Sequence, residues 1–153
     1  MFPLNLPDIE PNIKKEGKKT LIFDALRKRY VTLTPEEWVR QHFVSFLTKH
    51  KDYPASLIAN EMSIELNGMS RRCDTVVYDR NLNPLAIVEY KAPSVTISQR
   101  TFEQANAYNQ VLRVPYIIIS NGISHYCCHL DYERQVCEFL PEIPVYESLQ
   151  QKS

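Results

Sequence analysis

The run Tyr116–Ser120 (YIIIS) most constrains the fold of this chain. It has the length of one strand and is apolar on both of its alternating faces, which is typical of a central strand covered on both sides. Apolar spacing predicts helices at residues 35–49 and 97–112, and strands at 56–66, 73–79, 85–91, 123–130 and 135–140. This order predicts an α/β fold with a mixed central β-sheet flanked by helices.

Composition divides the chain into three segments. Residues 1–19 contain three prolines and a lysine-rich run, and we expect a basic N-terminal arm. Residues 20–140 are predicted to form a single domain that begins with a short β-hairpin at 20–23 and 30–33. Residues 141–153 resemble the arm in their prolines but are acidic, and we expect a C-terminal tail.

Composition also excludes several classes of function. The sequence holds three glycines in 153 residues, too few and too scattered for a Walker A loop or a dinucleotide-binding loop. No apolar run approaches the ~20 residues that span a bilayer, and the first residues do not have the pattern of a signal peptide. We therefore expect a cytoplasmic protein without a membrane partner and with reduced cysteines.

The segment 125–129 (HYCCH) contains residue types that bind zinc. Alternation places His125, Cys127 and His129 on one face of a strand, but successive ligands on a straight strand lie too far apart to close a tetrahedron. We therefore predict an ordinary half-buried strand there.

Three ionisable residues occupy predicted strands that should be apolar: Asp74, Glu89 and Lys91. Alternation puts Glu89 and Lys91 on the same face of their strand. An antiparallel pairing that sets Asp74 opposite Glu89 or Lys91 brings all three polar groups together, and a slip of one residue separates them.

Two converging carboxylates form an oxygen-rich site suited to Mg²⁺ or Mn²⁺. A lysine beside them can orient or deprotonate a water and neutralise charge on a phosphate, which is the chemistry of phosphodiester hydrolysis. The alternative is an exposed strand end on which Glu89 and Lys91 are only solvated.

The spacing of Asp74 and Glu89-Tyr90-Lys91 resembles the Asp…Glu-x-Lys core of the PD-(D/E)XK nuclease superfamily, with Cys73 where the superfamily name has proline. Neighbouring segments resemble the N-terminal nuclease domain of type I restriction enzyme R subunits: FDALR at 23–27, LTPEEWVRQ at 33–41, RCD at 72–74, IVEYKA at 87–92 and IIISNG at 117–122. The resemblance covers about residues 20–130. It implies a restriction-endonuclease-like core (α-β-β-β-α-β) and a Mg²⁺-dependent endodeoxyribonuclease of a restriction-modification system.

The resemblance also implies roles for single residues. Asp74 and Glu89 would bind the metal together with the Tyr90 backbone carbonyl, and Lys91 would position the attacking water. Superfamily members often add a carboxylate from the first helix, for which Glu37 is favoured over Glu36. Glu37 also suits a capping box with Thr34, and Arg40 is spaced to pair with Glu36.

The same resemblance predicts nucleic-acid contacts. Gln104 and Tyr108 match the Gln-x-x-x-Tyr motif of one nuclease branch, and positions four apart share a helix face. The likeliest phosphate-binding region by charge comprises Lys14, Lys15, Lys18, Lys19, Arg27, Lys28 and Arg29. The formal net charge of zero argues against tight, autonomous binding to DNA.

Two functions stay open at this point. The first is a metal-dependent endonuclease domain acting on double-stranded DNA. The second is a catalytically inactive DNA-binding or assembly module that keeps the nuclease fold. In the resembled enzymes a helicase-like motor follows the nuclease domain, and this sequence contains no such segment. We therefore expect a separate motor or restriction-modification subunit as partner, and a homodimer would help to cut both strands.

Overall fold

The small sheet and the large sheet of this protein are joined by one helix. The structure is a computed structural model that describes residues 3–66 and 68–149. The small sheet contains β1 (Ile13–Glu16), β2 (Lys19–Asp24) and β3 (Arg29–Thr32) in that order. The large sheet contains, in spatial order, β4 (Ile58–Leu66), β5 (Met69–Tyr78), β6 (Pro84–Tyr90), β7 (Tyr116–Ser120), β8 (His125–Asp131) and β9 (Val136–Leu140).

The two helices are α1 (Pro35–His50) and α2 (Gln99–Leu112), and short 3₁₀ turns lie at Ala55–Leu57 and Tyr146–Ser148. Strands β6 and β7 run parallel, because α2 carries the chain from the end of one to the start of the other. The other neighbouring pairs of the large sheet are antiparallel. The predicted mixed sheet is therefore confirmed, and α1 begins at the predicted residue.

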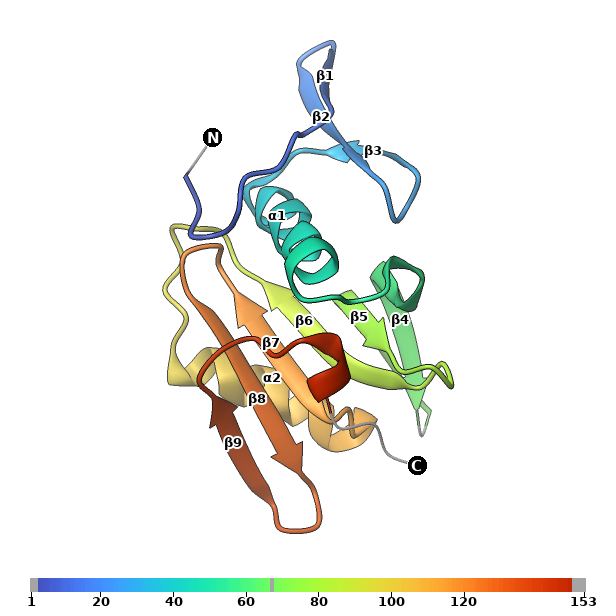
Figure 1. Ribbon diagram of the computed structural model, residues 1–153, viewed down its shortest axis with the longest axis vertical. Helices are drawn as coiled ribbons and strands as arrows, with labels where there is room; N and C mark the ends of the chain where they lie inside the picture. Colours follow the sequence, from blue (N-terminus) through green and yellow to red (C-terminus); the bar gives the residue numbers. More distant parts are fainter. Residues whose placement is uncertain (1–2, 67, 150–153) are drawn as a thin grey trace.

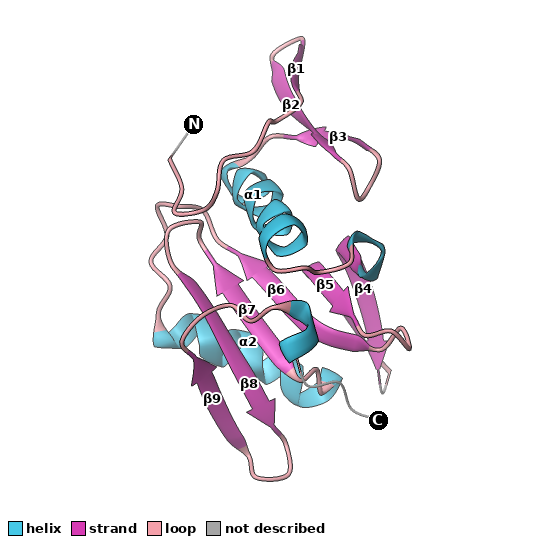
Figure 2. Ribbon diagram, viewed as in Figure 1, coloured by secondary structure: helices cyan, strands magenta, loops and turns pink. Residues whose placement is uncertain are grey.

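The helices lie on opposite faces of the large sheet (Figures 1 and 2). On the α1 face, Ile118 of β7 packs in the core cluster that contains Val39 and Phe43. On the α2 face, Ile117 and Ile119 belong to a second cluster with partly buried apolar residues of α2. Strand β7 is apolar at successive positions because both of its faces are covered.

Both ends of the chain are more structured than composition predicted. Residues 13–16 of the expected arm form β1, and the backbone N–H of Asn5 donates to the Gly122 carbonyl at 2.8 Å. Ile143, Tyr146 and Leu149 of the expected tail are buried in the core on the α1 face. Burial of this apolar surface holds residues 141–149 against the domain, since charge does not prevent a segment from packing through its apolar side chains.

The cysteines differ partly from expectation. Cys128 and Cys137 form a disulfide between β8 and β9, so the prediction of reduced thiols is wrong for these two. They are neighbours only across the β8–β9 hairpin, which a linear sequence does not display. Cys73 and Cys127 are free and buried, and burial raises the pKa of the Cys127 thiol to about 12.

Metal-binding clusters and membrane-spanning helices were both looked for among the described residues. Within the ranges 3–66 and 68–149, no three or more His, Cys, Asp or Glu side chains are grouped to hold a metal ion. Among the helices of those ranges, none is both long and apolar enough to cross a membrane.

Candidate functional site

The register between β5 and β6 brings Asp74 to Glu89. The antiparallel ladder ends with the pair of Thr75 and Val88, and Asp74 and Glu89 are the next residues along the two strands. Residues opposite one another in an antiparallel pair point to the same face. Asp74 and Glu89 therefore lie just beyond the last pair of a ladder whose register has the parity that the predicted convergence requires.

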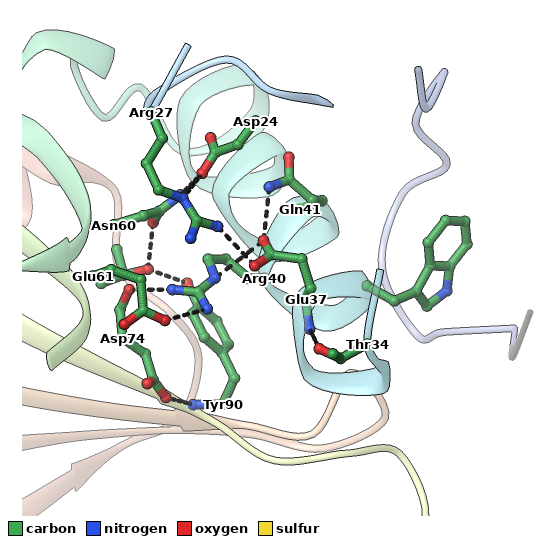
Figure 3. Close-up of polar contacts among 12 residues, drawn as sticks. Asp24, Arg27, Thr34, Glu37, Arg40, Gln41, Asn60, Glu61, Asp74 and Tyr90 are labelled. Atoms are coloured by element: carbon green, nitrogen blue, oxygen red, sulfur yellow. Dashed lines mark hydrogen bonds and ion pairs between the residues drawn. The ribbon is translucent and has the colours of Figure 1, made fainter. Parts of the chain in front are cut away.

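The Asp74 carboxylate reaches the segment that contains Glu89 and Lys91. Its Oδ2 accepts a hydrogen bond from the Tyr90 N–H at 2.9 Å (Figure 3). The Lys91 N–H donates to the Ser120 carbonyl at 2.9 Å, which keeps Lys91 beside the end of β7. Asp74, Glu89 and Lys91 are all half-buried, so solvent reaches each of the three predicted residues.

The donors at this position are of the type that a hard divalent cation takes. Asp74 and Glu89 supply carboxylate oxygens, and the Tyr90 carbonyl belongs to the same turn of chain. No third acidic side chain joins them into a larger cluster in the described part of the chain. The set therefore fits a cation such as Mg²⁺, which is held by one or two carboxylates and completes its shell with water or phosphate oxygens.

Glu37 is the inward-facing one of the two glutamates at the start of α1, whereas Glu36 is exposed. Its backbone N–H donates to Thr34 Oγ1 at 3.0 Å, so Thr34 caps the helix. Its carboxylate accepts from Arg27 Nη2 at 2.7 Å and lies 3.2 Å from Arg40 Nε. Arg40 therefore pairs with Glu37 and not, as the sequence predicted, with Glu36.

These contacts belong to a larger buried cluster on the α1 face, which we call the ionic network (Figure 3). Its members are Asp24, Arg27, Glu37, Arg40 and Glu61. Arg27 is ion-paired with both Asp24 and Glu37, and Arg40 Nη2 lies 2.7 Å from Glu61 Oε1. The ionic network therefore connects the small sheet, α1 and β4.

Two carboxylates of the ionic network, Asp24 and Glu61, have pKa values below their ordinary values. Burial raises the pKa of Asp24, but hydrogen bonds from Arg27, Asn60 and the Leu26 N–H outweigh it and hold the pKa below its ordinary value. Burial likewise raises the pKa of Glu61, while Arg72 and Arg40 lower it further than burial raises it. Both carboxylates are therefore stabilised in their charged form.

Arg27 lies in different surroundings from the other predicted DNA contacts. The Arg27 side chain is only 13% exposed and is ion-paired with Asp24 and Glu37, so it is not available to a phosphate. The basic run at 27–29 does not reveal which of its members turns inward. The exposed residues of the predicted phosphate-binding region are Lys14, Lys15, Lys18, Lys19, Lys28 and Arg29.

Helix α2 carries the two predicted contacts at residues 104 and 108. Gln104 is exposed, and the side chain of Tyr108 lies outside what the structure describes. Phe102 and Ala105 pack against the cluster of Ile117 and Ile119, which fixes α2 on the face of the sheet that carries Glu89.

The turn after β7 supports the site in a way that sequence analysis did not identify. Asn121 Oδ1 accepts from the N–H groups of Ile123 and Ser124 at 2.9 and 2.8 Å. Its Nδ2 donates to the Val95 carbonyl at 2.8 Å, in the loop that follows Lys91. The Asn-Gly pair at 121–122 is typical of a turn, but the bond to Val95 depends on tertiary contact.

Comparison with known proteins gives two likenesses. Residues 35–144 match the family described as type I restriction enzyme R protein N terminus. A search of curated proteins finds no match. Among solved structures, the chain is similar to a fragment described as an HsdR subunit of a type I restriction enzyme from Vibrio vulnificus YJ016, with 21% identity and a TM-score of 0.54. That match covers 76% of this chain and 24% of the other, so the chain spans about a quarter of the structure that it resembles.

Proposed function

Because this chain belongs to the family of type I restriction enzyme R protein N-terminal regions, we propose that it is a metal-dependent endonuclease domain that hydrolyses phosphodiester bonds in double-stranded DNA. The observation that carries the proposal is the hydrogen bond of the Asp74 carboxylate to the Tyr90 N–H, between Glu89 and Lys91. The element order from α1 to β7, helix, three strands, helix and strand, supports the proposed PD-(D/E)XK nuclease core.

In the proposed reaction, each residue of the site has one task. Asp74, Glu89 and the Tyr90 carbonyl would hold Mg²⁺ or Mn²⁺, and a cation bound there would neutralise charge on the scissile phosphate. Lys91 would orient the attacking water and take its proton or stabilise the developing charge. Within the described ranges no hydrogen bond or ion pair engages the Lys91 ammonium, which leaves it available for this task.

Substrate binding would use other surfaces. We propose that Gln104 and Tyr108 contact DNA beside the site, and that the exposed cations of the small sheet bind its phosphates. Other subunits of a type I restriction system, including the motor, would deliver the DNA, since the domain has no net charge to attract it. A homodimer is a further proposal. Glu37 as a metal ligand would require the loss of its contacts with Arg27 and Arg40.

Cleavage assays test the proposal directly. The purified chain should nick supercoiled plasmid in the presence of Mg²⁺ or Mn²⁺, and Asp74→Ala should abolish both cleavage and the Mn²⁺ uptake measured by calorimetry. Asp131→Ala is a matched control, because Asp131 is equally half-buried at a strand end but distant in the sheet order. A wild-type chain that neither cuts nor takes up Mn²⁺ contradicts the nuclease.

The alternative is a catalytically inactive DNA-binding or assembly module. The observation that favours it is that Glu37, the proposed additional metal ligand, is ion-paired with Arg27 and Arg40. DNA binding in a mobility-shift assay without cleavage or Mn²⁺ uptake would support this alternative.

A further inference from the structure

We propose that Arg40 is a positioning residue for the candidate active site, which it supports from the opposite face of the large sheet. Arg40 Nη1 donates to the main-chain carbonyl of Asp74 at 2.6 Å. It thereby holds the backbone from which the Asp74 carboxylate reaches the Tyr90 N–H. The inference deepens the proposed nuclease function and rests on it for its catalytic meaning.

An interruption in the ladder between β4 and β5 explains why Asp74 needs this donor. Asn60 pairs with Thr75 and Met62 pairs with Cys73, but the intervening Glu61 and Asp74 do not form a ladder pair. Glu61 has a φ of 56°, in the left-handed region that non-glycine residues rarely adopt. The guanidinium of Arg40 therefore supplies a hydrogen bond at the one position of this pairing where the strand backbone departs from regular geometry.

The surroundings of Arg40 hold its guanidinium in one place. The side chain is 7% exposed and is ion-paired with Glu37 and Glu61. Its guanidinium carbon lies 5.7 Å from the centroid of the Tyr90 ring. Arg40 thus contacts both residues, Asp74 and Tyr90, whose mutual hydrogen bond defines the site.

Other contacts fix Tyr90 independently of Arg40. The Tyr90 hydroxyl donates to Thr75 Oγ1 at 2.9 Å, and the Thr75 hydroxyl donates to Asn60 Oδ1 at 2.7 Å. Loss of Arg40 should therefore shift Asp74 relative to a Tyr90 that stays in place. A lysine keeps the charge, but its single ammonium cannot reproduce the planar fork that reaches Asp74, Glu37 and Glu61 together.

The test compares Arg40→Lys with Arg27→Lys in the full chain. Arg27 belongs to the same ionic network and shares Glu37, but none of its described hydrogen bonds or ion pairs is made with Asp74. The first readout is hydrogen exchange of the Tyr90 amide by NMR, which reports the bond to Asp74 without any metal. The second is Mn²⁺ affinity by calorimetry.

Arg40→Lys should speed exchange of the Tyr90 amide by about tenfold and weaken Mn²⁺ binding by about tenfold, the range found for groups that orient metal ligands. Arg27→Lys should leave both values within about twofold of the wild type, even where it lowers the melting temperature equally, because it does not orient a ligand. Equal exchange and equal Mn²⁺ affinity in the two variants would overturn the role of Arg40 and leave the nuclease proposal standing.

Two other outcomes remain informative. If the wild type takes up no Mn²⁺, the proposed nuclease fails, and the catalytic meaning of Arg40 fails with it, while Tyr90 exchange still decides whether Arg40 positions Asp74. If Arg40→Lys does not fold, Glu61→Gln weakens the hold on Arg40 at a more exposed position. It should accelerate Tyr90 exchange in the same direction by a smaller factor, and unchanged exchange would overturn the inference.

Discussion

Two regions of the molecule, the ionic network and the carboxyl end of β6, contain the same kinds of charged residue in different surroundings. On the α1 face, Asp24, Glu37 and Arg40 are buried and ion-paired within the ionic network. At the carboxyl end of β6, Asp74 and Lys91 are half-buried beside Glu89, on a position that solvent reaches.

This difference separates structure from chemistry. A buried charge that is ion-paired can bind a substrate only if its ion pair is broken, which costs free energy. Removal of one partner leaves the other charge buried without a counter-charge. A half-buried carboxylate can exchange water for a metal ion at little cost. We therefore expect mutations of the ionic network other than at Arg40, which also contacts Asp74, to change stability. Mutations at the end of β6 should change activity.

The largest expected effect is on catalysis at the end of β6. Lys91→Ala should reduce DNA cleavage by about a thousandfold, because a general base or charge-stabilising group is removed from the reaction. The melting temperature should stay close to that of the wild type. Lys51→Ala, at an equally half-buried lysine after α1, is the control and should cut normally. Equal cleavage by the two variants would break the comparison.

The next effect is on the stability of the ionic network. Arg27→Met should lower the free energy of unfolding by about 3–5 kcal/mol, because Asp24 and Glu37 would be left without their shared counter-charge. Urea unfolding measures this loss, and the exposed Arg29→Met should change it by only about 0.5 kcal/mol. A small loss for both variants would mean that the network behaves like surface ion pairs.

Stability should also fall in acid because of groups on the α1 side. The pKa values of Asp24 and Glu61 are lowered in the folded state, so their stabilisation is present above about pH 4 and is lost as pH falls through the lowered values. Burial lowers the pKa of His125 more than its bond to the Asn5 carbonyl raises it. Its neutral form therefore stabilises the fold above about pH 6.5, and the loss begins below that value.

Thermal unfolding between pH 7 and pH 3 checks this prediction. The melting temperature should decline in two steps, the first from His125 and the second from the carboxylates. Asp24→Asn should lower the melting temperature at pH 7 and flatten the second step, because the group that titrates there is removed. A second step of unchanged height in this variant would assign the acid sensitivity to other carboxylates.

The smallest expected effect concerns exposed cations, which belong to neither region. Lys18→Ala should weaken DNA binding a few-fold and reduce the slope of log affinity against log salt by about 0.9, the value for one lost phosphate contact. Lys49→Ala, an exposed lysine near the end of α1, is the comparison variant. The same slope for both would remove the small sheet from the DNA-binding surface.

Much of the fold was predictable because its signals are local. Helix α1 begins at Pro35 as the Thr34 cap predicts, and β7 carries apolar residues at successive positions because both faces are covered. The buried residues of segment 141–149 and the Cys128–Cys137 disulfide were not predicted, since each depends on which distant segments meet.

In the candidate site, too, local signals predicted some features, and others depend on tertiary contacts. Side-chain alternation alone placed Glu89 and Lys91 on one face, and the register that adds Asp74 was one of the two that the sequence allowed. The roles of Arg27 and Arg40 were not predicted. Arg27 lies in a basic run that is typical of a solvated surface, and Arg40 was expected to pair with Glu36.

The sequence by itself determined the order and type of the elements from β2 to β9, the family and the identity of the three residues proposed for catalysis, because periodicity, capping and motif spacing act over a few residues. Only the tertiary structure decided which charges are buried in pairs and that Arg40 of α1 meets the backbone of Asp74 in β5. These contacts arise where the small sheet, α1 and β4 come together, and the burial that makes each charge costly or useful exists only after that packing.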